Sequence, residues 1–223
     1  MNSNIKIARV VGVLFIIGTV AGVLSMVFLG PFLGDPDYLT SFAANRNKII
    51  NGSLLILTMG FSLSMVPVLL YPVFKKFSEP LALGAVVFRG ALEAVIYILQ
   101  TVNLLLLLAL SQVFTSAGSA DITVFHHLGA LVLEADEWLA HILSLVFSLG
   151  ALMIYYLFYQ SRLIPRWLSV WGIIGGIFYF AAPLLGMYGI EWGFLMLPLA
   201  VQEMVLALWL IIKGFNPKVI VSL

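Results

Sequence analysis

Residues 81–112 read LALGAVVFRGALEAVIYILQTVNLLLLLALSQ, an almost wholly apolar run that decides the fold. A helix rises 1.5 Å per residue, so about 20 apolar residues cross the roughly 30 Å hydrocarbon core of a membrane. Hydropathy marks further runs of spanning length at residues 8–30, 49–73, 136–160, 167–187 and 192–213. The sequence therefore predicts an all-α integral membrane bundle of six transmembrane helices, forming a single domain over residues 1–223.

The overall composition supports a membrane location. Hydrophobic residues make up 62% of the chain and charged residues 9%, and the mean hydropathy is +1.12. Such a chain cannot cover its surface with polar groups, so lipid must be its main solvent. The net charge of +1 is too small to indicate nucleic acid as a partner. The absence of cysteine excludes disulfides, thiolate metal ligands and a thiol nucleophile.

Positively charged residues flank the predicted spans unevenly. Of the eleven Lys and Arg residues, eight fall on the side where the chain starts: Lys6, Arg9, Lys75, Lys76, Arg162, Arg166, Lys213 and Lys218. Only Arg46 and Lys48 fall on the opposite side. Because Lys and Arg accumulate on the cytoplasmic side of membrane proteins, we expect both termini to be cytoplasmic.

Two connections on the outer side are long enough to hold short helices. Asp35 and Pro36 form a helix-start signal, with Asp as the N-cap and Pro in the first turn, and predict an interfacial helix near 36–45. Residues 121–134 form a second apolar stretch that is too short to cross the membrane before the next span. We expect it to form another interfacial helix.

Polar residues inside the spans mark where function is to be sought, because unpaired charge in hydrocarbon costs several kcal/mol. At 100° per residue, one face of the third span carries a polar stripe. It consists of Arg89, Glu93, Tyr97, Gln100 and Asn103. Arg89 and Glu93 lie one turn apart and can form an ion pair. Such a pair can be structural, or it can serve a site for a ligand, proton or ion.

Spans two, four and six also contain polar positions. Span two aligns Asn51, Thr58 and Ser62, and span four aligns Glu137, His141, Ser144, Ser148, Tyr155 and Tyr159. Together these faces predict a polar seam through the bundle. In span six, Gln202 and Glu203 lie near mid-membrane, at a depth comparable to that of Glu93. If spans three and six touch, two carboxylates share the guanidinium of Arg89, an arrangement that suits either a proton-coupled step or a static brace.

A second cluster lies near the outer face. His126, His127, Glu137 and His141, with Asp136 beside them, supply imidazole and carboxylate groups of the kind that bind zinc. A zinc ion there would activate water, which defines a metal-dependent hydrolase as an alternative function. The spacing matches no zinc-protease motif, and Asp136 and Glu137 also suit the start of a helix. Two interpretations therefore remain open: a metal site, or ordinary polar residues at the membrane interface and at a helix start.

Several sequence blocks carry a resemblance to a known family. They are YYLFYQSRLIPRWLSVWG at 155–172, AAPLLG at 181–186, VPVLLYP at 66–72, Phe88-Arg89 with Glu93, LP at 197–198, QEM at 202–204 and KGF at 213–215. The chain resembles the bacterial membrane-protein family catalogued as domain of unknown function 4386. This resemblance implies a multi-pass protein of a bacterial inner membrane and supplies no activity or catalytic residue. The blocks include Arg89, Glu93 and Glu203 but not the histidines, which favours the mid-membrane charges.

Three hypotheses therefore stand. The leading one is a non-enzymatic bundle with an internal polar pocket at Arg89, Glu93 and Glu203, which binds or passes a small molecule, a proton or a lipid and needs no cofactor. The second is an outward-facing hydrolase that uses zinc at the histidine cluster. The third is a structural or regulatory partner of another membrane protein. Membrane lipid is the expected partner in each case.

Overall fold

The computed structural model describes residues 3–116 and 122–221, and the regular structure within these ranges is entirely helical. The elements are α1 Ser3–Leu33, α2 Tyr38–Ala44, α3 Arg46–Phe74, α4 Glu79–Ala85, the π-helix η1 Val86–Leu92, α5 Glu93–Ser116, α6 Ile122–Ser161, α7 Arg166–Gly186, the 3₁₀-helix η2 Gly193–Met196, α8 Leu197–Ile212 and α9 Pro217–Val221. Elements α4, η1 and α5 form one continuous helix. Within the described residues, six helices are long and apolar enough to cross a membrane, which confirms the predicted fold class.

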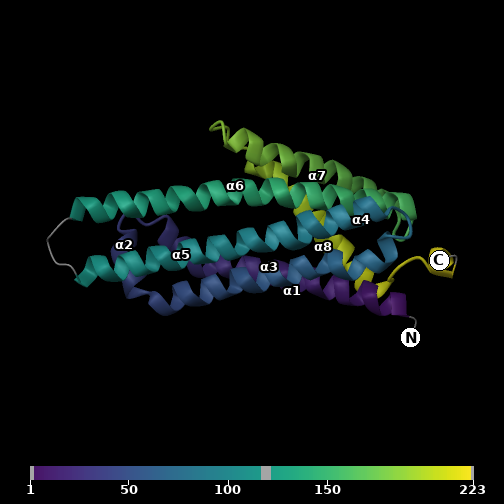
Figure 1. Ribbon diagram of the computed structural model, residues 1–223, viewed down its shortest axis with the longest axis horizontal. Helices are drawn as coiled ribbons and strands as arrows, with labels where there is room; N and C mark the ends of the chain where they lie inside the picture. The colour runs from purple at the N-terminus through teal and green to yellow at the C-terminus, as the bar shows by residue number, and fades with distance from the viewer. Residues whose placement is uncertain (1–2, 117–121, 222–223) are drawn as a thin grey trace.

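The six long helices close into a ring in chain order. Helix α1 packs against α3, α3 against α5, α5 against α6, α6 against α7, α7 against α8, and α8 returns to α1. A closed ring has an interior that every helix can line. Both termini lie at the same end of the bundle, at the right in Figure 1. The sequence predicted that they share a side, and the assignment of that side to the cytoplasm stays a prediction.

The helices differ in length, and this gives the bundle two unlike ends. Helix α6 has 40 residues and α7 has 21, which correspond to about 60 Å and 32 Å of helix. In Figure 1, α5 and α6 run on together past α7 toward the end where α2 lies. An apolar cluster that includes Leu39, Phe42 and Leu107 binds α2 to this extension. Helices α5 and α6 are therefore longer than a membrane core requires.

The second of the two predicted interfacial helices is not a separate element. Residues 122–134 form the first part of α6, and residue 121 lies outside the described residues. Phe125 and Val132 pack into the apolar cluster around α2, and the Tyr38 hydroxyl donates a hydrogen bond to the His126 carbonyl at 3.1 Å. These contacts hold the segment in line with the rest of α6. Asp136, which looked like part of a helix start, lies inside the helix.

The first predicted interfacial helix is present as α2, but it begins later than its start signal suggests. Helix α2 starts at Tyr38 rather than directly after Asp35. The backbone N–H of Asp37 donates to Oδ1 of Asp35 at 2.9 Å, and the Thr40 hydroxyl donates to Oδ1 of Asp37 at 3.0 Å. The Ser41 hydroxyl also donates to Asp35. Asp35 therefore stabilises a turn before the helix, and Asp37 occupies the cap.

Candidate functional site

Arg89 lies in the middle of the π-helix η1, within the third span. Short π-helical segments within α-helices occur frequently at functional sites, because the wider turn shifts the side chains that follow. Helix α6 approaches this segment closely at Gly150. A Cβ atom at that position would lie 2.6 Å from both the Cβ atom and the backbone nitrogen of Arg89. The glycine therefore allows α6 to seal the site from one side.

The guanidinium of Arg89 joins two carboxylates from different spans. Nη1 donates to both oxygens of Glu93, at 2.8 and 2.9 Å, and Nη2 donates to Oε1 of Glu203 in α8 at 3.0 Å. The Tyr155 hydroxyl of α6 donates to the same oxygen of Glu203 at 3.2 Å. The Phe147 ring lies 4.0 Å from the guanidinium carbon. The structure thus brings together Arg89, Glu93 and Glu203 across the ring interior.

This arrangement leaves the cluster short of one positive charge. Two ionised carboxylates and one guanidinium sum to a formal charge of −1, and the ion pairs formed at the cluster in residues 3–116 and 122–221 both use Arg89. The neighbouring polar groups from α5, α6 and α7 are the uncharged phenols Tyr97, Tyr155 and Tyr179. A net charge held in a low-dielectric interior is costly. The site is therefore suited to hold one further positive charge.

A cavity of about 260 Å³ lies beside the cluster, within the ring. Its polar lining consists of Thr19, Tyr97, Ser144, Tyr179 and Glu203. Its apolar lining includes Val23, Met26, Met59, Leu63, Leu143, Phe147 and Leu199. All six long helices contribute. The side chain of Glu203 is 12% exposed, whereas Glu93 is 1% exposed, so Glu203 is the carboxylate that the cavity reaches.

The cavity borders the outer surface of the bundle between α1 and α8. The two helices approach each other closely at Gly12, where a Cβ atom would lie 2.6 Å from the Ala207 carbonyl oxygen. The cavity is lined by the opposite ends of both helices, where Val23 is 56% and Met26 is 74% exposed and Ala200 is exposed. These residues belong to helices that are long and apolar enough to cross a membrane.

The members of the span-three stripe that lie farther along the helix, Gln100 and Asn103, belong to a second polar group. Gln100 and Asp136 line a separate cavity of about 250 Å³. Asn103 donates its amide to the Val132 carbonyl at 2.9 Å and to Oδ1 of Asp136 at 3.3 Å. Met26 lines both this cavity and the one beside Glu203. One end of the stripe thus belongs to the charged cluster, and the other end belongs to the hydrogen-bonded pair of Asn103 and Asp136.

The structure places two other predicted sets of polar side chains, on α8 and α3, away from the charged cluster. Gln202 is fully buried, but its amide donates to the Leu168 carbonyl of α7 at 3.0 Å, so it is turned away from the charged cluster. On α3, Asn51 and Thr58 are exposed on the outside of the bundle. The Thr58 hydroxyl donates to the Leu54 carbonyl of its own helix at 2.9 Å. Asn51 and Thr58, two of the three predicted members of the polar seam on span two, therefore do not face the interior, whereas Ser62 is partly buried.

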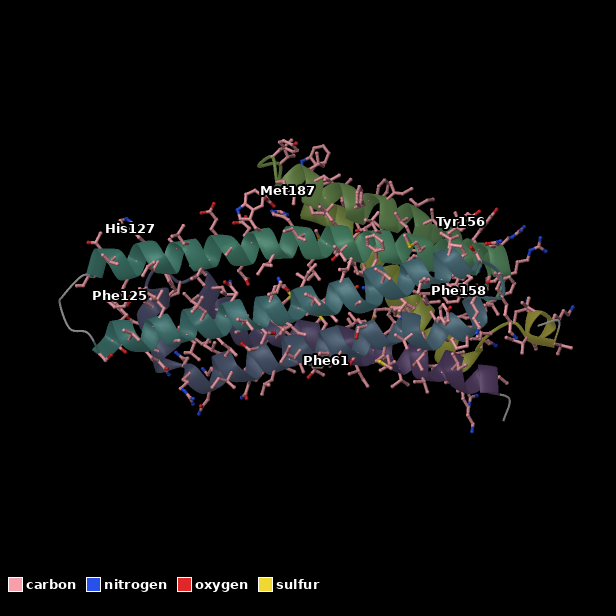
Figure 2. The ribbon with its side chains drawn as sticks, viewed as in Figure 1. Phe61, Phe125, His127, Tyr156, Phe158 and Met187 are labelled. Carbon is pink, nitrogen blue, oxygen red and sulfur yellow. The ribbon has the colours of Figure 1, made fainter. Side chains whose placement is uncertain are left out.

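The four predicted metal ligands are spread along one helix. His126 and His141 are 15 positions apart on the continuous α6, about 22 Å along its axis. The His126 ring packs against Tyr38 and Phe114, and Figure 2 shows His127 on the side of α6 away from α5. Glu137 is exposed. Within the described residues, no three His, Cys, Asp or Glu side chains are grouped so that they could hold a metal ion.

Some residues at the cluster carried little signal in the sequence. Tyr155 belonged to the predicted stripe on span four, but its link to Glu203 depends on how α6 and α8 pack. Phe147 is one of many aromatic residues in the spans, and its position under Arg89 follows only from the three-dimensional arrangement. Gly150 likewise has no distinguishing neighbours in the sequence. Tertiary contacts, rather than local patterns, define these positions.

The fold and the comparisons together define what kind of protein this is. The part of the chain that the structure describes is a multi-helix bundle with six helices long and apolar enough to cross a membrane, and with a charged group enclosed within their ring. The family model described as Domain of unknown function (DUF4386) matches residues 10–214, so the chain belongs to this family. No curated protein and no solved structure matches the chain.

Proposed function

We propose that this protein is a non-enzymatic membrane protein that binds a small amphiphilic cation inside its helical ring. In this proposal the carboxylate of Glu203 receives the positive charge of the ligand, and a proton occupies the site when no ligand is bound. The observation that carries the proposal is the charge imbalance at a cavity: two carboxylates share one guanidinium, and Glu203 lines the adjoining space.

The lining of the cavity supports an amphiphilic ligand rather than a bare ion. Its walls are largely apolar, with Met26, Met59 and Leu199 among them, whereas Glu203 and Tyr179 supply oxygen atoms. Binding pockets for small molecules combine apolar walls with a few polar groups that fix orientation. An ammonium group with a short alkyl or aryl tail has the complementary distribution of charge and apolar surface.

Glu203 is the expected contact because Glu93 is already saturated. Both oxygens of Glu93 accept hydrogen bonds from one nitrogen of Arg89, and its side chain is almost inaccessible. The hydrogen bonds that Arg89 and Tyr155 donate to Glu203 both fall on its Oε1 atom. The ligand would therefore bind to Glu203 while the Arg89–Glu93 pair holds the site in place.

Calorimetric titration with primary alkylammonium ions, from butyl to decyl, tests the proposal. The purified protein is placed in nanodiscs of zwitterionic lipid. Affinity should rise about fourfold for each added CH₂ until the chain fills the cavity, because burying one CH₂ group contributes about 0.8 kcal/mol. Repeating the titration in buffers of different ionisation enthalpy counts the protons released. We expect about one proton per ligand when the ammonium group replaces the proton at Glu203.

The variant Glu203→Gln should lose saturable binding, and Glu134→Gln, which changes an exposed carboxylate on α6, should keep it. The same heats in wild type and Glu203→Gln would indicate partition into lipid and would contradict the proposal. If the cluster is only a static brace, no alkylammonium ion should bind to the wild-type protein at all.

A further inference from the structure

A separate and larger cavity lies at the end of the bundle that holds the two termini. Its volume is about 540 Å³, and it is formed where α6 ends, α7 begins and α8 ends. Three basic side chains line it: Arg162, Arg166 and Lys213. Among the residues that the structure describes, no acidic side chain is part of this lining. The cavity is therefore strongly cationic, in contrast to the anionic site within the ring.

Arg162 adopts a backbone conformation that its side chain disfavours. Its φ angle is +56°, in the left-handed region that glycine enters freely. The position caps α6, with its N–H donating to the Phe158 carbonyl at 3.0 Å. Glycine is the usual residue at such a cap, and Gly214, across the cavity, has a φ of +70°. Glycine would suit this backbone conformation better than arginine does. The presence of arginine therefore indicates that its side chain has a function.

We propose that this cavity binds a phosphate group, carried either by the headgroup of an anionic phospholipid or by a soluble phosphate ester. Guanidinium groups suit phosphate because their N–H donors match its oxygens in pairs. Arg166 also stands in the first turn of α7, where free backbone N–H groups and the helix dipole favour an anion. The bound phosphate would supply the negative charge that this lining lacks.

The surroundings of the cavity agree with a position at the headgroup level of a membrane. Trp209 lines the cavity, and the exposed Trp167 ring lies 6.5 Å from it, centroid to centroid. Tryptophan is concentrated at the membrane–water interface, and basic pockets between spanning helices bind anionic headgroups. The site needs no contribution from Glu203 or Arg89, so it stands independently of the function proposed above.

Tryptophan fluorescence titration of the delipidated protein in neutral detergent tests the proposal, because Trp209 lies at the cavity. The probes are phosphatidylglycerol, phosphatidylcholine, glycerol 3-phosphate and inorganic phosphate. We expect phosphatidylglycerol to bind at least about tenfold more tightly than phosphatidylcholine, the ratio that one charge-assisted hydrogen bond provides. Saturable binding of glycerol 3-phosphate would identify a soluble ester as a ligand. Binding of phosphatidylglycerol alone would identify the lipid.

The variant Arg162→Gly separates binding from folding, because glycine accepts the left-handed conformation at least as well as arginine. Its thermal unfolding midpoint should equal or exceed that of the wild type, while its affinity for phosphatidylglycerol should fall about tenfold. Lys213→Gln should weaken binding in the same way. Lys75→Gln is the control, because Lys75 is a basic residue at the C-terminal end of α3 that is not part of the cavity lining. Unchanged affinity in Arg162→Gly, equal affinity for the two lipids, or an equal loss in Lys75→Gln would overturn the proposal.

Discussion

Replacing Glu93 by glutamine should reduce the stability of the protein far more than the same replacement at Glu203, although both carboxylates hold Arg89. Glu93 accepts two charge-assisted hydrogen bonds at 2.8 and 2.9 Å in a site that is 1% exposed. A hydrogen bond to a charged group contributes about 1.5–3 kcal/mol, and breaking a buried ion pair costs about 3–5 kcal/mol. Because Glu203 still partly compensates Arg89, we expect a loss of about 3 kcal/mol in Glu93→Gln.

The expected change in the free energy of unfolding is smaller for Glu203→Gln. This variant resembles the protonated Glu203 that we propose for the ligand-free site, so it leaves the Arg89–Glu93 pair neutral and mainly weakens one hydrogen bond of 3.0 Å from Arg89. The change in stability should stay within about 1 kcal/mol. For a chain of this length, 1 kcal/mol corresponds to about 2–4 °C in the unfolding midpoint. Glu93→Gln should therefore lower the midpoint by about 6–12 °C, and Glu203→Gln by no more than about 4 °C.

The assay is thermal unfolding in nanodiscs, followed by tryptophan fluorescence at a single scan rate. Glu134→Gln serves as the control for the loss of an exposed carboxylate and should leave the midpoint unchanged. An equal or larger loss in Glu203→Gln than in Glu93→Gln would refute the reasoning, because it would make Glu203 the main structural partner of Arg89.

Three further predictions concern other parts of the molecule. Gly150→Ala should destabilise the protein by about 1–3 kcal/mol in the same unfolding assay, because its methyl group would meet the backbone of Arg89. The hydrogen bond from Ser41 lowers the pKa of Asp35, so Ser41→Ala should raise that pKa in a carboxyl NMR titration. A carboxylate with a lowered pKa stabilises the fold at pH values above the ordinary carboxyl pKa, and this stabilisation is lost as pH falls through the pKa of the folded state. The stability of Ser41→Ala should therefore fall less on acidification than that of the wild type. Elemental analysis should find less than one zinc per chain, because the candidate ligands are spread along α6; one bound zinc per chain would support the hydrolase hypothesis instead.

Much of the fold follows from the sequence because a membrane limits the possible structures. Backbone groups in hydrocarbon must be satisfied internally, so each apolar run of spanning length has to be helical. Helix boundaries were less predictable. Asp136 and Glu137 look like a helix start, yet α6 continues through them because residues before them pack on α2 and Asn103 bonds to Asp136. Periodicity also could not show that Asn51 and Thr58 face outward, since a polar face has no preferred direction until its neighbours are known.

The candidate site was only partly accessible to sequence reasoning. The one-turn spacing of Arg89 and Glu93 predicts their pairing, because residues four apart share a helix face. The contact between Arg89 and Glu203 joins residues 114 positions apart, and it depends on the closure of the ring by α8. The π-helix around Arg89 and the Phe147 ring beneath it arise from packing and carry no local signature.

Photo-crosslinking with an alkylammonium ion that carries a photoreactive group on its tail would locate a cation bound within the helical ring. In nanodiscs, we expect crosslinks at cavity residues of α1, α3 and α8, such as Met26, Met59 and Leu199, mapped by mass spectrometry. These crosslinks should disappear in Glu203→Gln and remain in Glu134→Gln. Crosslinks scattered over the lipid-facing surface, or a pattern unchanged in Glu203→Gln, would contradict the claim that the ring encloses a site for a positive charge.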